Sequence, residues 1–173
     1  TDGVYTGPNL AGNTPYILMA KHNVTSPNHT LHLNGDSRLT DSYTGALLTD
    51  GSLRIGANRN EVDFFAGDLS EVIIYNKRIN SAQELIVTNY LSAKFGIDIG
   101  TADIYPYEST HPHELAGIGR IDQDNMHTKA QSGGILAVGG ATDLEDGEFL
   151  LFGHDGGATD DWTTVETPES DPN

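Results

Sequence analysis

Helical periodicity is confined to one stretch of this chain, and this constrains the fold more than any other feature. Only around residues 80–96 do apolar side chains recur at three- and four-residue spacing over several turns. Elsewhere they come in short runs bounded by Gly, Asn, Asp or Pro, which is typical of short strands joined by turns. We therefore expect an all-β fold carrying one short helix.

The helix should span residues 81–95. Asn80 can cap its N-terminus and Gln83 lies three residues further on, an Asn variant of the capping box. Gly96 should end it. One apolar stripe is expected to pack onto a sheet, and it consists of Ala82, Leu85, Ile86, Tyr90 and Ala93.

Strand signals lie on both sides of the helix. Residues 30–33 alternate apolar and polar side chains before Asn34-Gly35, the strongest two-residue hairpin signal, so a hairpin is predicted there. The other expected strands lie at residues 16–21, 53–56, 64–65, 72–75, 135–138 and 149–152.

Charge and composition exclude several kinds of partner. Among 173 residues, 25 are acidic and 9 are basic, so the net charge of −16 should repel nucleic acids and anionic membrane surfaces. No apolar stretch is long enough for a membrane helix. The absence of cysteine excludes disulfides and thiolate chemistry. Such an acidic excess favours screening by salt or divalent cations.

Several motifs in the middle of the chain occur in a characteristic order. Leu33-Asn34-Gly35 and the Leu-Arg-Ile-Gly run at 53–56 precede Phe-Ala-Gly-Asp-Leu-Ser-Glu-Val-Ile-Ile-Tyr-Asn at 65–76, and Ser81-Ala82-Gln83-Glu84 opens the helix. Residues 30–97 thereby resemble the C-terminal half of laminin-G-like (concanavalin-A-like) jelly-roll domains of bacterial surface proteins and adhesins. Residues 113–120 and the strands that follow are similar to an accessory β module found after such domains.

The resemblance implies a domain organisation. Residues 1–15 form an irregular lead-in, 16–97 a jelly-roll-like β-sandwich, 98–112 a linker, 113–166 the accessory module and 167–173 a second linker. Because the matched motifs belong to the second half of a jelly roll, residues 1–97 are expected to be incomplete as a domain. Other domains or subunits would then supply strands, and the edges concerned are residues 16–21 and 72–75.

Calcium is the cofactor that the acidic loops suggest, because it takes carboxylate, carbonyl and water oxygens. The resemblance places an acidic residue near a structural calcium in this strand region, although Ser70 replaces the usual Asp. For Asp68 and Glu71 the alternative is that Asp68 caps a turn and Glu71 pairs with a neighbouring strand, and for the other acidic loops it is solvated surface charge. The candidate metal ligands are Asp68 and Glu71, and Asp122 and Asp124 beside Asn125. His111, His113 and Glu114 could reach zinc, but a strand start partly exposed to solvent is the more ordinary explanation of them.

Ligand recognition and catalysis receive unequal support. Jelly rolls usually bind glycans with an exposed aromatic ring beside Asp, Asn or Arg on rim loops, and the candidates here are Tyr43, Asn58, Arg59, Asn60 and Trp162. We find no strand with paired carboxylates for glycoside hydrolysis and no Gly-x-Ser-x-Gly elbow, so no enzymatic activity is expected.

The sequence thus predicts an extracellular, cell-surface module for adhesion or for glycan or protein recognition, assisted by calcium. A purely structural module of a surface filament or matrix is the alternative. A targeting domain of a polysaccharide-degrading enzyme is a third. A surface protein or glycan is the expected partner, without nucleic acid and without membrane insertion.

Overall fold

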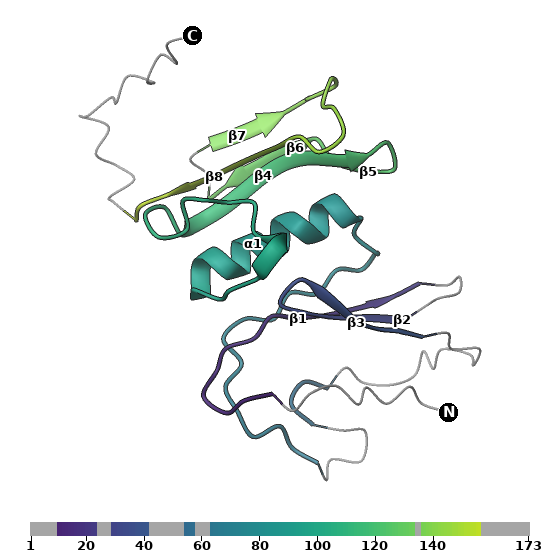
Figure 1. Cartoon of the computed structure of the whole chain (residues 1–173), viewed down its shortest axis with the longest axis vertical. Coiled ribbons are helices and arrows are strands. Elements are labelled where there is room, and N and C mark those ends of the chain that lie inside the picture. The colour runs from purple at the N-terminus through teal and green to yellow at the C-terminus, as the bar shows by residue number, and fades with distance from the viewer. Residues whose placement is uncertain (1–9, 24–28, 42–53, 58–62, 134–135, 157–173) are drawn as a thin grey trace.

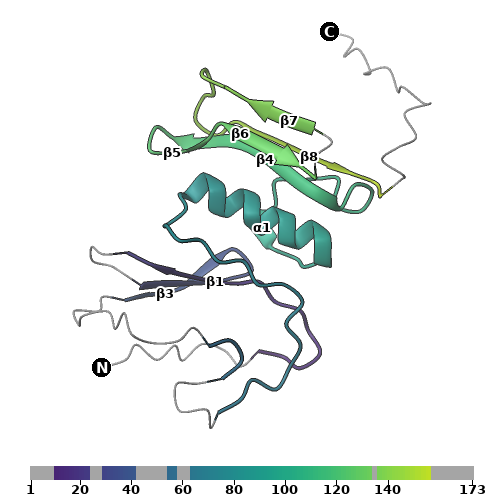
Figure 2. The same cartoon turned by 180° about the vertical axis from the view of Figure 1, so that it is seen from behind.

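The computed structural model describes residues 10–23, 29–41, 54–57, 63–133 and 136–156, and these form a sheet-rich fold with one α-helix. The helix α1 (Ser81–Phe95) lies between an N-terminal sheet and the C-terminal strands (Figures 1 and 2). All strand pairs are antiparallel. The strands are β1 (Leu18–His22), β2 (His29–Leu33), β3 (Asp36–Asp41), β4 (His113–Asp122), β5 (Asn125–His127), β6 (Lys129–Ser132), β7 (Leu136–Gly139) and β8 (Phe149–His154).

The predicted helix is confirmed at both ends. The Asn80 side chain accepts a hydrogen bond from the Gln83 backbone N–H, and the Gln83 side chain accepts one from the Asn80 backbone N–H. Gly96 takes the left-handed conformation that favours glycine, with φ of 63°. Local capping chemistry therefore decides where this helix begins and ends.

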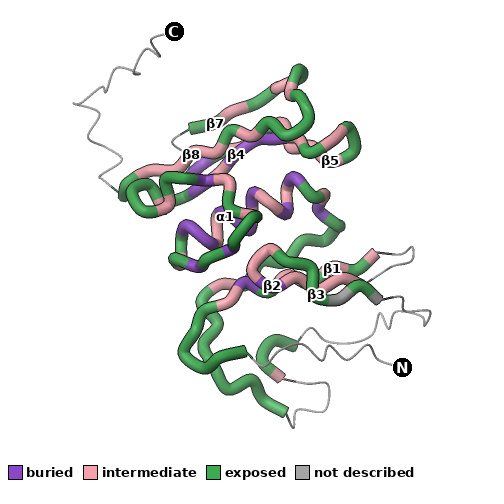
Figure 3. The backbone as a smooth tube through the Cα atoms, in the orientation of Figure 1, coloured by how far each residue is buried: buried purple, intermediate pink, exposed green. Residues whose placement is uncertain are grey.

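The apolar stripe predicted for α1 is covered, with Ala82, Ile86 and Ala93 buried, but the helix is also buried on a second side that was not predicted (Figure 3). Leu91 and Phe95 pack against Ile17, Ile97 and Ile99. On the other side, Tyr90 and Ala93 belong to a second cluster, which also contains Tyr105, Leu115 and Leu151. A helix that contacts two layers cannot confine its apolar residues to one face, so buried polar side chains share both faces with them.

The N-terminal sheet has the order β1-β2-β3. The predicted hairpin is confirmed, since Asn34 (φ 50°) and Gly35 (φ 84°) make the turn between β2 and β3 with the positive φ angles that this turn needs. Lys21 of β1 contacts α1, so alternate residues of β1 face away from the helix. Leu18 and Ala20 lie on this outward face and are exposed, opposite Leu33 and Leu31 of β2.

The C-terminal strands form two small sheets, with the orders β5-β4-β8 and β6-β7. The strand predicted at 149–152 is confirmed within β8, and the one at 135–138 corresponds to β7. Gly119 of β4 lies directly against Phe149, because a Cβ atom there would be 2.1 Å from the aromatic ring. The pairing of β4 with β8 therefore depends on glycine at this position.

Hydrogen bonds join the start of α1 to β5. The Asn80 side chain donates to the Met126 carbonyl (2.8 Å), and the Ser81 N–H donates to the Asn125 side chain (3.0 Å). Gln83 contacts His127 at 3.2 Å.

No helix in the described part of the chain is both long and apolar enough to cross a membrane.

The strand predicted at residues 72–75 does not form. The described residues of the strands predicted at 53–56 and 64–65 also form no strand. One isolated antiparallel bridge, between Ala57 and Phe64, lies in this region. The side chains of 72–75 are of strand type, but a strand also needs a hydrogen-bonded neighbour. None of the described residues supplies a backbone hydrogen bond to 72–75.

Candidate functional site

Two adjacent phenylalanines form the most exposed aromatic feature of the described residues. Phe64 is 70% exposed and Phe65 is 57% exposed. They are held in place by the bridge between Ala57 and Phe64 and by a 2.8 Å hydrogen bond from the Phe65 N–H to the Gly56 carbonyl. We call these two side chains the aromatic patch.

The backbone of Gly67 supports the aromatic patch. A Cβ atom on Gly67 would lie 2.8 Å from the Phe65 ring, so the ring rests over the glycine. Large apolar side chains exposed to solvent are candidates for a contact surface. An aromatic ring presented to solvent can stack on the apolar face of a sugar or of another side chain.

The predicted binding residues fall outside the part of the chain that the structure describes. Tyr43, Asn58, Arg59, Asn60 and Trp162 belong to residues 42–53, 58–62 and 157–173. Their roles stay predictions. The isolated bridge joins Ala57 and Phe64, described residues that flank Asn58, Arg59 and Asn60 in the sequence.

The first predicted metal pair lies next to α1. The Glu71 carboxylate accepts hydrogen bonds from the Tyr90 hydroxyl (3.0 Å) and from the Lys94 ammonium (2.9 Å). The hydrogen bonds to Tyr90 and Glu71 raise the pKa of Lys94. A cation therefore already neutralises Glu71, while Asp68 is exposed three residues earlier.

The second predicted pair lies in the turn between β4 and β5. The Asp122 carboxylate accepts hydrogen bonds from the Asn125 side chain and from the backbone N–H groups of Asp124 and Asn125, all at 2.9 Å. The Asn125 side chain contributes most to lowering the pKa of Asp122. Asp122 thus closes its own turn, and Asp124 is exposed beside it.

The described donors do not fit a preformed metal site. Within 10–23, 29–41, 54–57, 63–133 and 136–156, no three His, Asp or Glu side chains are grouped so that they could hold an ion. In the acidic loop before β8, Asp146 pairs with Arg120 at 2.7 Å. Calcium binding by Asp68, Glu71, Asp122 or Asp124 therefore stays a prediction.

A histidine pair was not anticipated from the sequence. His113 of β4 lies opposite His154 of β8, with ring centroids 5.6 Å apart. His154 is also 3.5 Å from the Glu114 carboxylate. The sequence places His113 and Glu114 together but holds no signal for the register of β4 against β8, which is what brings His154 to them.

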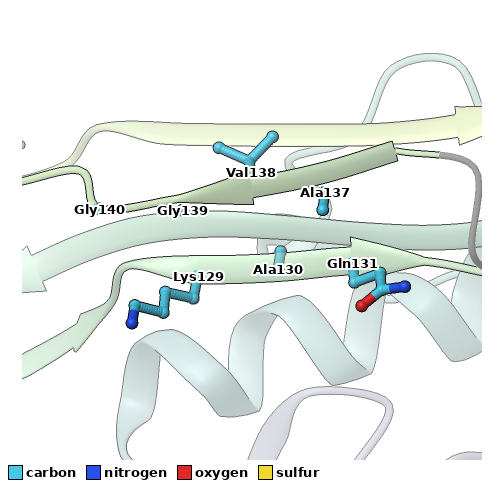
Figure 4. A pocket seen from close by; sticks show the side chains of 7 residues that line it. All are labelled: Lys129, Ala130, Gln131, Ala137, Val138, Gly139 and Gly140. Carbon is cyan, nitrogen blue, oxygen red and sulfur yellow. The ribbon is translucent and has the colours of Figure 1, made fainter.

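The hollows on the surface are shallow. One lies over the β6-β7 sheet (Figure 4), and its lining of small side chains with Lys129 and Gln131 provides no convergent polar groups. Another runs between α1 and β4 and is bordered by Ile73, Tyr75 and Tyr90. Neither hollow has the enclosed form of a small-molecule site, whereas the aromatic patch suits contact with a surface.

Comparison with known proteins adds no identity. The chain matches no protein-family model, no curated protein and no solved structure. The resemblance to laminin-G-like jelly rolls therefore rests on the motifs of the sequence.

Proposed function

We propose that this chain is an extracellular adhesion or recognition module of a bacterial surface protein, without enzymatic activity, and that it binds glycans through the aromatic patch. The observation that carries the proposal is the exposure of Phe64 and Phe65, which follow the Asn58-Arg59-Asn60 run in the sequence. A neutral glycan suits a chain of net charge −16, which would repel anionic polymers. The extracellular setting follows from the resemblance to surface proteins.

The N-terminal sheet supports the jelly-roll part of the proposal. In a sandwich, each sheet covers the apolar face of the other. The outward face of β1 and β2 carries Leu18, Ala20, Leu31 and Leu33, on the side away from α1. Leu18 and Ala20 are exposed on this face, whereas Leu31 is half-buried and Leu33 is buried. The face therefore has the character of an inner sandwich face.

A glycan array tests the recognition function. We expect the purified chain to bind a reproducible subset of glycans, and the double variant Phe64→Ser/Phe65→Ser to bind at least about tenfold more weakly because two stacking rings are lost. Leu150→Ser is the matched control, since Leu150 is a similarly exposed apolar residue on β8. Silence of the wild-type chain on glycans would contradict the proposal and favour a structural module of a surface filament.

Calcium assistance has its own test. An ion that binds only the native state stabilises it, by about 2.7 kcal/mol when the ion is present at a hundred times its Kd. We therefore expect excess calcium to raise the midpoint of thermal unfolding above its value in chelator. The gain should shrink in Asp68→Asn or Asp124→Asn, which remove exposed candidate ligands. Identical midpoints in calcium and in chelator would remove calcium from the account.

A further inference from the structure

We infer that residues 66–79, the unpaired segment, form an antiparallel β-pair with the same segment of a second copy of this chain. The assembly goes beyond glycan recognition, because it uses different side chains from the aromatic patch.

The backbone of the unpaired segment is available for pairing. Residues 66–79 form no backbone–backbone hydrogen bond with any residue in the described part of the chain. Their sequence nevertheless includes Val72-Ile73-Ile74-Tyr75, which are strand-forming residue types. A row of N–H and C=O groups that the described residues leave unpaired is a template for adding a strand.

The apolar side chains of the segment lie in solvent. Leu69, Val72, Ile73, Ile74 and Tyr75 are between 40% and 62% exposed, although a strand packed on a core would bury every second one. Figure 3 shows the exposed stretch running below α1. A contiguous run of this kind indicates a surface made for contact.

The segment is held at Glu71 and at its C-terminal end, so its position is defined before a partner arrives. Glu71 is bound to Tyr90 and Lys94 on α1. At the C-terminal end Ile79 is buried and Asn80 caps the helix. Such anchoring lowers the entropy that pairing would cost.

The charges at the two ends favour a second copy as the occupant. Asp68 lies toward the start of the segment, and Lys77 and Arg78 toward its end, all of them exposed. In an antiparallel pair with Ile73 opposite Ile73, Asp68 faces Arg78 of the partner subunit, and Val72 faces Ile74 of the partner subunit. The two-fold symmetry repeats each contact, so the segment is complementary to itself.

Charge also predicts how the dimer responds to salt. Each copy carries −16, so the two copies repel one another at long range, and the small contact area makes the dimer a weak one. Added salt screens that long-range repulsion more than it weakens the short contacts between Asp68 and Arg78 of the partner subunit, and the apolar contacts persist. The dimer fraction should therefore rise with ionic strength.

Analytical ultracentrifugation over a concentration series tests the proposal. We expect a monomer–dimer equilibrium in the wild-type chain and loss of the dimer in Ile73→Glu. Leu150→Glu, at a comparably exposed site on β8, and the double variant of the aromatic patch should both keep it. A wild-type chain that stays monomeric up to its solubility limit would overturn the proposal, as would a dimer that tolerates Ile73→Glu.

A charge exchange tests the register. Asp68→Arg and Arg78→Asp each place like charges opposite one another and should each weaken the homodimer about tenfold. Mixed in equal amounts, the two variants restore opposite charges at both ends and should form a heterodimer of wild-type strength. Circular dichroism checks that both variants fold. Failure of the mixture to associate would overturn the antiparallel pairing.

Discussion

Replacing Lys21 with methionine is expected to lower the free energy of unfolding by about 3–5 kcal/mol. The Lys21 ammonium lies 2.6 Å from the Glu84 carboxylate, and both side chains are only 12% exposed. Without the ammonium, Glu84 stays in a poorly solvated position between β1 and α1 with no opposite charge. The loss is therefore the cost of an unpaired buried charge rather than the value of the ion pair.

The double variant Lys21→Met/Glu84→Leu separates these two quantities. It removes both charges and should recover most of the stability, because apolar replacements of a buried pair are often neutral or stabilising. Chemical denaturation followed by circular dichroism measures all three proteins. A single variant that loses less than about 1 kcal/mol, as surface pairs do, would show that the pair is effectively solvated.

Replacing Asn89 with leucine should lower the free energy of unfolding by about 3–5 kcal/mol, since two partly buried backbone groups lose their partners. Asn89 is 1% exposed. Its side chain donates to the Ala102 carbonyl (2.8 Å) and accepts from the Ile104 N–H (2.9 Å). These bonds fix the chain between α1 and β4.

Gln123→Leu is the matched control for this substitution. It makes the same kind of exchange, of an amide for an apolar side chain, at an exposed position in the turn between β4 and β5. It should change the free energy of unfolding by no more than about 0.5 kcal/mol. An Asn89→Leu variant as stable as this control would show that water replaces the lost bonds.

The parts of the fold that depend on near neighbours could be predicted from the sequence. Asn80, Gln83 and Gly96 determine the ends of α1 through contacts within a few residues. Asn34 and Gly35 determine the hairpin through their own φ angles. Chemistry of this kind can be read without knowing the rest of the structure.

Contacts between distant residues could not be predicted. Lys21 and Glu84 are 63 residues apart in the sequence, and no sequence pattern near either residue predicts that they form an ion pair. The register of β4 against β8 likewise depends on Gly119 admitting the Phe149 ring. The prediction of a strand at 72–75 was wrong for a related reason. The β-propensity of a residue type does not show whether a neighbouring strand is there to pair with it.

The candidate site was predicted less well than the fold. The predicted ligand-binding residues lie outside the described residues, and Glu71 and Asp122 are engaged by protein partners. The exposure of Phe64 and Phe65 could not be anticipated, because they appeared to be strand residues with the usual buried face. What distinguishes them is that the described residues supply no second layer to cover them.

Hydrogen exchange of the backbone amides of residues 69–75, followed by mass spectrometry over a range of protein concentrations, tests the central claim most directly. At low concentration these amides should exchange almost as fast as in an unfolded chain, while those of β4 stay protected. Their protection should grow with concentration as the second copy pairs with them. Strong protection of 69–75 at low concentration, or fast exchange that concentration does not change, would contradict the account.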